Sequence, residues 1–193
     1  MFKDLQEALD FPLQCPAWPQ YRGETRYSEL ARRFVDEHGI GVGDVVGGAS
    51  LGGMIALEIA KIVPVRAVVL LGSCTDARMV HRAMFNLSPL AAYTPVRLLQ
   101  SIIGAIPHTL CRMFAECDPE LMRAMALHIK HWPGKTGVTA PVFQLHGKRD
   151  LMIRCPAECD LILPTAGHVP TMTHTFECAA FMRNIRRNIL AQT

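Results

Sequence analysis

The sequence predicts one α/β domain in which helices flank a mostly parallel sheet. Residues 44–49 and 65–71 are short apolar runs typical of buried strands, and residues 51–62 between them suit a helix that Pro64 cannot continue. Strand patterns return at residues 141–146 and 161–163. A strand, a helix and a strand in so short a stretch form a crossover unit whose strands run parallel.

The composition fits a single globular domain over residues 1–193, because 50% hydrophobic and 19% charged residues are enough to fill a core. The net charge is +3, and the basic residues are scattered, which argues against a nucleic-acid surface. The seven cysteines form no CxxC pair, so free thiols are favoured over a zinc site or disulfides. Residues 1–5 show no signal pattern and no apolar run is long enough to span a membrane, so we expect a cytoplasmic protein.

Three elements are expected before the first strand. Residues 1–9 and 25–38 suit helices, and residues 11–15 are a short apolar run that suits the end of a strand. The residues expected on the inner faces of the two helices are Phe2, Leu5, Leu9, Leu30, Phe34 and Val35.

Residues 76–132 interrupt the alternation of strands and helices. The segment is rich in Met, Leu, Arg and Pro and shows no strand pattern, so we expect a helical insert within the domain. Its expected helices cover residues 77–85, 95–106, 109–116 and 119–130. A closing amphipathic helix is expected over residues 175–190. Its candidate inner positions are Phe176, Ala179, Ala180, Ile185 and Ile189.

Residues 48–52 read Gly-Ala-Ser-Leu-Gly and place Ser50 between a predicted strand and a predicted helix. The pattern alone is weak, but a nucleophile at such a junction occupies a strained turn for which neighbouring glycines leave room. The helix N-terminus also directs amides at the site, and these stabilise developing negative charge. Ser50 is therefore the candidate nucleophile, and the alternative is a small residue at a tight helix start.

A serine nucleophile needs a base, and the base needs an acid that orients it. Asp150 and His168 each follow a predicted strand, so both lie in loops at the carboxyl ends of parallel strands, where ligand chemistry occurs in such sheets. As alternatives, Asp150 could cap a turn and His168 could be an exposed loop residue. Asp76 is a rival acid and His174 a rival base. The histidines interpreted as structural or surface groups are His81, His108, His128, His131 and His146.

Taken together, residues 48–52, 146–150 and 167–168 resemble the three catalytic segments of α/β-hydrolases, in the same order along the chain. The resemblance extends over about residues 1–191. It implies a Ser50–Asp150–His168 triad, with the amide of Leu51 holding part of an oxyanion.

The family resemblance also assigns two further segments. Residues 16–19 lie where the family carries its fourth-strand loop, and the insert 76–132 lies at the family's lid position. The family has about three strands before the helix matched by residues 1–9, and the third supplies a second oxyanion donor. Because these strands are missing here, we expect a gap in the sheet beside the strand at residues 44–49. Residues 11–15 could fill this gap, or another element could cover it. A misplaced start of the gene model would also explain the missing strands.

The resemblance implies a serine hydrolase that cleaves a carboxylic ester or related acyl substrate, without metal or cofactor and with a small molecule as its only expected partner. The alternative is a catalytically impaired or truncated protein of this fold that acts as a binding module. A C–C bond hydrolase, a thioesterase and a lactonase share the same motif. A dehalogenase is disfavoured because it needs Asp where this chain has Ser50. The substrate and the oligomeric state stay open.

Overall fold

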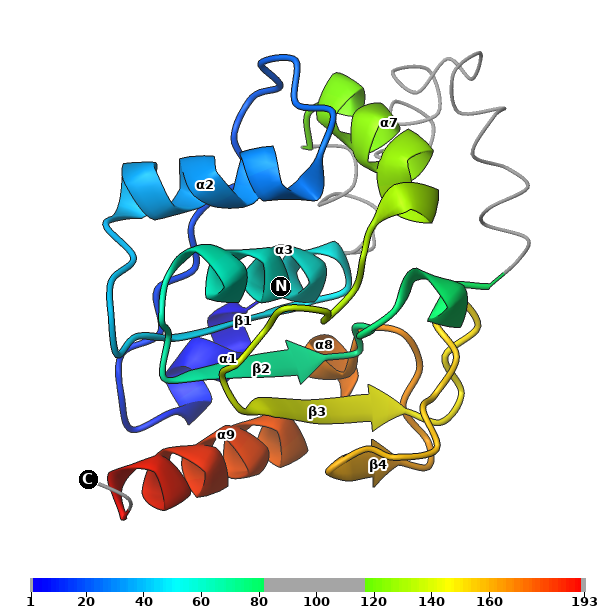
Figure 1. The fold of residues 1–193 in the computed structure, drawn as a ribbon. Helices are drawn as coiled ribbons and strands as arrows, with labels where there is room; N and C mark the ends of the chain where they lie inside the picture. Colours follow the sequence, from blue (N-terminus) through cyan, green and yellow to red (C-terminus); the bar gives the residue numbers. More distant parts are fainter. Residues whose placement is uncertain (1, 82–116, 192–193) are drawn as a thin grey trace.

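The computed structural model describes residues 2–81 and 117–191 (Figure 1). The strands are β1 (Val45–Ala49), β2 (Ala67–Leu71), β3 (Val142–Gly147) and β4 (Leu161–Leu163). The α-helices are α1 (Lys3–Ala8), α2 (Tyr27–His38), α3 (Leu51–Ile62), α7 (Pro119–His128), α8 (Pro170–Thr173) and α9 (Thr175–Leu190). Two 3-10 helices are η1 (Ala77–Met79) and η2 (Ile129–His131).

The described strands form one parallel sheet in the order β1-β2-β3-β4. In this register Ala49 lies beside Leu71, and Leu71 lies beside Leu145. Because all of these strands run the same way, the loops that follow them leave from one edge of the sheet. The α/β fold class expected from the sequence is confirmed.

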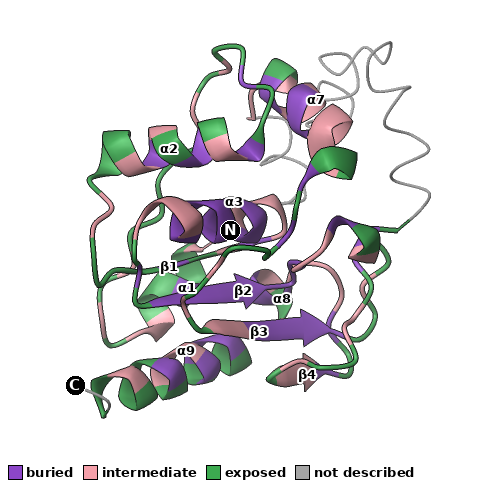
Figure 2. Cartoon of the chain, viewed as in Figure 1, coloured by how far each residue is buried: buried purple, intermediate pink, exposed green. Residues whose placement is uncertain are grey.

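Helices cover both faces of the sheet, as Figures 1 and 2 show. Helices α2 and α3 share one buried cluster with Val68 and Leu70, whereas α1 and α9 share the other with Val69 and Leu71. Successive residues of a strand point to opposite faces, so a strand buried on both sides needs an unbroken apolar run. This requirement explains why every residue of β2 is buried.

The N-terminal segment differs from the one expected from the sequence. Residues 11–15 form no strand, so they do not pair beside β1. Leu13 packs against the cluster under α1 and α9, and Phe11 lies below the guanidinium of Arg186 at 5.0 Å. Within residues 2–81 and 117–191, the outer edge of β1 therefore has no strand partner. Val45 at this edge is 50% exposed.

Helix α9 has the expected bounds and part of the expected inner face, because Ala179 and Ile185 are buried and Ile189 packs against the core. The expected inner residues Phe176 and Ala180 are exposed, with Phe176 80% exposed. The buried residues of this helix are Cys178, Ala179, Phe181 and Ile185, which share one face at helical spacing. The error arose because Phe176 was assigned inward by its hydrophobicity, whereas α9 turns that position to solvent.

The insert is described only at its two ends. The helix expected over residues 77–85 is wrong in its described part, because only Ala77–Met79 is helical and Val80 forms an antiparallel bridge with Ile153. The helix expected over residues 119–130 is confirmed as α7 and η2. The helices expected at 95–106 and 109–116 lie outside the described residues, so the insert at 76–132 and the single domain stay predictions. In the described ranges, no helix combines the length and apolar character that a membrane span requires.

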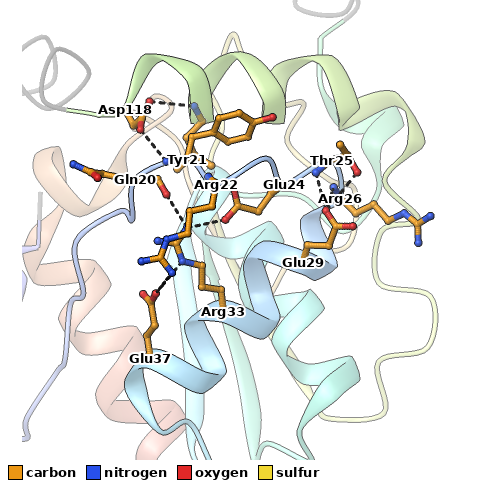
Figure 3. Close-up of polar contacts among 11 residues, drawn as sticks. Gln20, Tyr21, Arg22, Glu24, Thr25, Arg26, Glu29, Arg33, Glu37 and Asp118 are labelled. Atoms are coloured by element: carbon orange, nitrogen blue, oxygen red, sulfur yellow. Dashed lines mark hydrogen bonds and ion pairs between the residues drawn. The ribbon is translucent and has the colours of Figure 1, made fainter.

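A network of polar contacts fixes the loop that precedes α2 (Figure 3). The carboxylate of Asp118 caps α7 and also accepts the backbone amide of Tyr21 at 2.8 Å. Arg33 on α2 donates to the carbonyl of Gln20 at 2.7 Å and pairs with Glu24, also at 2.7 Å. Loop residues 20–24 are therefore tied to α2 and to α7 rather than to the sheet.

The buried ion pair in this network predicts a stability effect. The side chains of Arg33 and Glu24 are only 13% and 8% exposed, so removing the guanidinium leaves a carboxylate in a poorly solvated place. We expect Arg33→Met to lower the free energy of unfolding by about 2 to 3 kcal/mol. Urea unfolding of this variant and of Arg32→Met, at an exposed neighbouring position, makes the comparison. Equal losses for the two variants would contradict the importance of the pair.

Candidate active site

Ser50 lies where β1 passes directly into α3, and its backbone has φ 50° and ψ −122°. It is the one non-glycine residue with positive φ among the described residues. Such a conformation costs about 1–3 kcal/mol, so the surrounding structure must hold it in place. The turn projects the side chain away from the end of β1 at the carboxyl edge of the sheet.

Two glycines make room for this turn, and they differ from the pair in the motif. A methyl group on Gly48 would overlap the backbone of Gly52 and Gly53. A methyl group on Gly53 would lie 2.5 Å from the side chain of Ser73. Apart from the neighbouring backbone of α3, no heavy atom of the described residues lies within 4 Å of the position that a methyl group on Gly52 would take. The close packing of the turn therefore requires glycine at positions 48 and 53.

A buried polar network supports the turn from below. The hydroxyl of Ser73, after β2, donates to the carbonyl of Ser50 at 2.6 Å, and the amide of Gly53 donates to the same carbonyl at 3.1 Å. The side chain of Gln144 on β3 donates to the carbonyl of Ser73 at 2.9 Å. The ends of β1, β2 and β3 are thus connected through Ser50, Ser73 and Gln144. Sequence analysis assigned no role to Ser73 or Gln144, because neither belongs to a recognisable motif.

The side chains of Ser50, His168 and Asp150 meet. His168 Nε2 lies 2.9 Å from Ser50 Oγ, and His168 Nδ1 lies 2.8 Å from Asp150 Oδ2. Because a carboxylate only accepts hydrogen bonds, Nδ1 carries the hydrogen and Nε2 is left to accept from the serine hydroxyl. The order of contacts is that of a nucleophile, a base and an orienting acid.

The two rival residues make other contacts. The carboxylate of Asp76 binds the guanidinium of Arg78 at 2.7 Å and caps η1. The ring of His174 lies between the hydroxyls of Thr165 and Thr173, at 2.9 and 2.8 Å.

The loops that carry Asp150 and His168 are joined by backbone contacts. The amide of Arg149 donates to the carbonyl of Ala166 at 2.9 Å. A methyl group on Gly147 would overlap the carbonyls of Ala166 and Gly167, so only glycine allows this approach. Gly72, with φ 61°, faces the carbonyl of His168 in the same manner. The position of the imidazole therefore depends on close backbone packing at the ends of β2 and β3.

The carboxylate of Asp150 is fully buried, and both of its oxygens accept hydrogen bonds. Its Oδ1 accepts the amides of Met152 and Ile153 at 2.7 and 3.0 Å, and its Oδ2 accepts His168. Burial alone would raise the pKa of Asp150, but hydrogen bonds from His146, His168 and the Ile153 amide outweigh it. They hold that pKa well below the usual value, so the acid stays ionised beside the imidazole.

His146 is the residue that sequence analysis undervalued. Its ring is fully buried, which agrees with the interpretation as a structural group and not with that as a surface group, and Nε2 lies 3.3 Å from Asp150 Oδ2. The available signal was its place at the end of a strand, four residues before the candidate acid.

The helix N-terminus beside Ser50 offers backbone amides. The amides of Gly53 and Met54 bind the carbonyl of Ser50 at 3.1 and 3.4 Å, and the amide of Leu51 precedes them at the first position of α3. The role of Leu51 as an oxyanion donor stays a prediction. In the part of the chain that the structure describes, no group of three or more His, Cys, Asp or Glu side chains is arranged to hold a metal ion.

The sequence matches no protein-family model and no curated protein. Solved structures with a similar fold include a thermophilic esterase from Thermogutta terrifontis, at 16% identity and TM-score 0.65, covering 97% of this chain and 85% of that one. A lipase-esterase related protein from Clostridium acetobutylicum has 17% identity and TM-score 0.64, with 95% and 87% covered. An enol-lactonase from Burkholderia xenovorans has 15% identity and TM-score 0.60, with 86% and 75% covered. The chain thus has the α/β-hydrolase fold.

The two glycines of the motif should respond differently to a methyl group, because Gly48 faces backbone and Gly52 faces open space. We expect Gly48→Ala to lower the free energy of unfolding by about 1–3 kcal/mol, because the methyl group meets backbone that cannot move aside. Gly52→Ala should be neutral or stabilise by up to about 1 kcal/mol, because space is open and alanine favours the helix. Thermal and urea unfolding measure both. A larger loss for Gly52→Ala would contradict this geometry.

The low pKa of Asp150 predicts a pH-dependent contribution to stability. A carboxylate whose pKa is depressed in the folded state stabilises that state above its ordinary value of about 3.9, and the contribution is lost as pH falls through the folded value. Asp150→Asn should therefore unfold more easily than wild type at pH 7, by about 2 kcal/mol, and the difference should shrink below about pH 4.

Urea unfolding between pH 7 and pH 3 measures that difference. Asp36→Asn, at an exposed position of α2, controls for the loss of one charge. A difference between wild type and Asp150→Asn that grows as pH falls below about 4 would contradict the depressed pKa.

Proposed function

We propose that this chain is a serine hydrolase that cleaves a carboxylic ester or a related acyl substrate. The observation that carries the proposal is the hydrogen-bonded line from Ser50 Oγ through His168 to Asp150, with distances of 2.9 and 2.8 Å. The strained conformation of Ser50 supports it, because strain at a well-supported position is typical of functional residues.

In the proposed first half-reaction, Ser50 Oγ forms a bond to the carbonyl carbon while its proton moves to His168 Nε2. The amide of Leu51 donates to the oxygen that becomes negatively charged. When the tetrahedral intermediate collapses, the bond to the leaving alkoxide breaks and Nε2 returns the proton to it. Asp150 stays ionised throughout and stabilises the imidazolium.

In the second half-reaction, a water molecule gives a proton to His168 Nε2 and its oxygen attacks the acyl carbon. The bond to Ser50 Oγ then breaks, Oγ recovers the proton, and the acid is released. The proposed reaction needs no metal or cofactor. Similar structures named as an esterase and an enol-lactonase support an ester or lactone as the substrate class. The proposal includes a cytoplasmic location, based on the cysteine pattern of the sequence.

A specific observation supports a second candidate, a hydrolase-fold binding module with impaired catalysis. The outer edge of β1 has no strand partner within the described ranges, and this edge lies next to Ser50. Leu51 is then the one oxyanion donor that can be named. Loss of one such donor lowers the rate by about 10² to 10³.

Labelling with a fluorophosphonate probe tests the nucleophile. We expect rapid labelling of wild type, none of Ser50→Ala, and a rate lower by about 10³ for His168→Ala, because the hydroxyl loses its base. His174→Ala is the matched control and should label as wild type does, since its ring contacts Thr165 and Thr173 instead. Labelling that survives Ser50→Ala would remove Ser50 from its proposed role.

Turnover of a panel of aryl and alkyl esters separates the two candidates. Hydrolysis that disappears in both Ser50→Ala and His168→Ala supports the enzyme. Rapid probe labelling of wild type without turnover of any ester favours the impaired module.

A further inference from the structure

We infer that His146 is a positioning residue for Asp150, which it orients toward His168 through a hydrogen bond from Nε2. The inference rests on the proposed function in so far as Asp150 is the acid of the triad. The contact itself is a property of the fold, so it can be tested without a substrate.

The tautomer of His146 follows from its contacts. Its Nε2 lies 3.1 Å from the carbonyl oxygen of Ile153 and 3.3 Å from Asp150 Oδ2. A carbonyl oxygen only accepts, so Nε2 carries the hydrogen and donates it to the carbonyl of Ile153, while Asp150 Oδ2 lies close enough to the same N–H group to be attracted by it. Nδ1 of the same ring is buried and has no hydrogen-bond partner within the described ranges. The polar contacts of this ring are therefore with the loop of residues 148–155 that carries Asp150, the acid loop.

The contact completes the coordination of the carboxylate. Oδ1 of Asp150 is held by the amides of Met152 and Ile153, whereas Oδ2 is approached by two imidazoles, from His146 and His168. His146 Nε2 makes the longer of the two contacts with Oδ2, 3.3 Å against 2.8 Å for His168 Nδ1. His146 thus steadies the carboxylate and draws part of its negative charge, while the shorter bond to His168 is kept.

The acid loop is also tied down on its far side. The amide of Arg154 donates to the carbonyl of Met79 at 2.8 Å, and the amide of His81 donates to the carbonyl of Met152 at 2.8 Å. Val80 and Ile153 form an antiparallel bridge. The backbone of the loop is therefore fixed by residues 79–81 as well as by the bond from His146 to the carbonyl of Ile153, so it keeps several ties when His146 is changed.

Within the described ranges, two thiols lie where the charge of Asp150 acts on them. Burial raises the pKa of Cys74, after β2, to about 12, and it also raises the pKa of Cys155, in the acid loop. Both thiols therefore stay neutral near pH 7. Lys148 acts on Cys155 from the exposed start of that loop, and Asp76 acts on Cys74 from its own side. Neither thiol therefore adds a charge that acts on Asp150 near pH 7.

Removal of the His146 donor should make Asp150 a stronger acceptor for His168. More negative charge then remains on Oδ2, which favours the protonated imidazole of His168. We expect the pKa of His168 to rise by about 0.5 to 1 unit in His146→Phe, which keeps a ring of similar size without a donor.

Two polar variants separate positioning from packing. In His146→Gln the amide nitrogen reaches the place of Nε2 and can donate to Asp150, so the pKa of His168 should return to within about 0.2 unit of the wild-type value. In His146→Asn the amide lies one carbon closer to the backbone and cannot reach, so the upward shift should persist. Glutamine and asparagine have the same chemistry, so any difference between them reports the contact.

The experiment is a proton NMR titration of the ring of His168 in wild type and in the three variants, with its resonance identified by its loss in His168→Ala. An upward shift in His146→Asn and in a folded His146→Phe, reversed in His146→Gln, supports the inference. The same pKa in His146→Asn as in wild type, or an equal shift in Gln and Asn, overturns it. Because the readout needs no turnover, failure of the proposed hydrolase activity shows separately, in the probe and ester assays.

Discussion

The backbone conformation of Ser50 is the constraint to which the other features of the site are fitted. A non-glycine residue keeps a φ of 50° only where the surrounding packing and hydrogen bonds prevent it from adopting a more favourable conformation. Gly48 and Gly53 allow strand and helix to approach, and Ser73 and Gln144 connect the turn to the next two strands. These contacts bring the hydroxyl to the edge of the sheet.

The second requirement is that two loops distant in sequence meet at that edge. The parallel sheet supplies the direction, because every strand ends on the same side. Gly147 and Gly72 supply the close approach, and Asp150 fixes the ring of His168 from behind. The carboxylate of Asp150 accepts two backbone amides, and His146 Nε2 lies 3.3 Å from its Oδ2. The contacts of Asp150 thus orient its carboxylate, and the carboxylate orients the ring of His168 toward Ser50.

Much of this arrangement could be predicted from the sequence, because hydrophobic periodicity and strand-to-helix junctions are local properties. The helix over Leu51–Ile62 and the strand Leu161–Leu163 have the predicted bounds, and the candidates Ser50, Asp150 and His168 lie in contact. Residues 11–15 looked like a strand, but a strand needs a neighbour, and neighbours are set by tertiary structure. The contacts of Ser73 and His146 could not be predicted from the sequence, because they join residues that only the tertiary structure brings together.

The pH dependence of fluorophosphonate labelling tests most directly whether His168 deprotonates Ser50. Only the neutral imidazole can accept the proton, so the labelling rate of wild type should rise through a single pKa and reach a plateau, and this dependence should vanish in His168→Ala. A rate that instead rises in proportion to hydroxide with no plateau, or a profile unchanged by His168→Ala, would contradict a catalytic line through these three side chains.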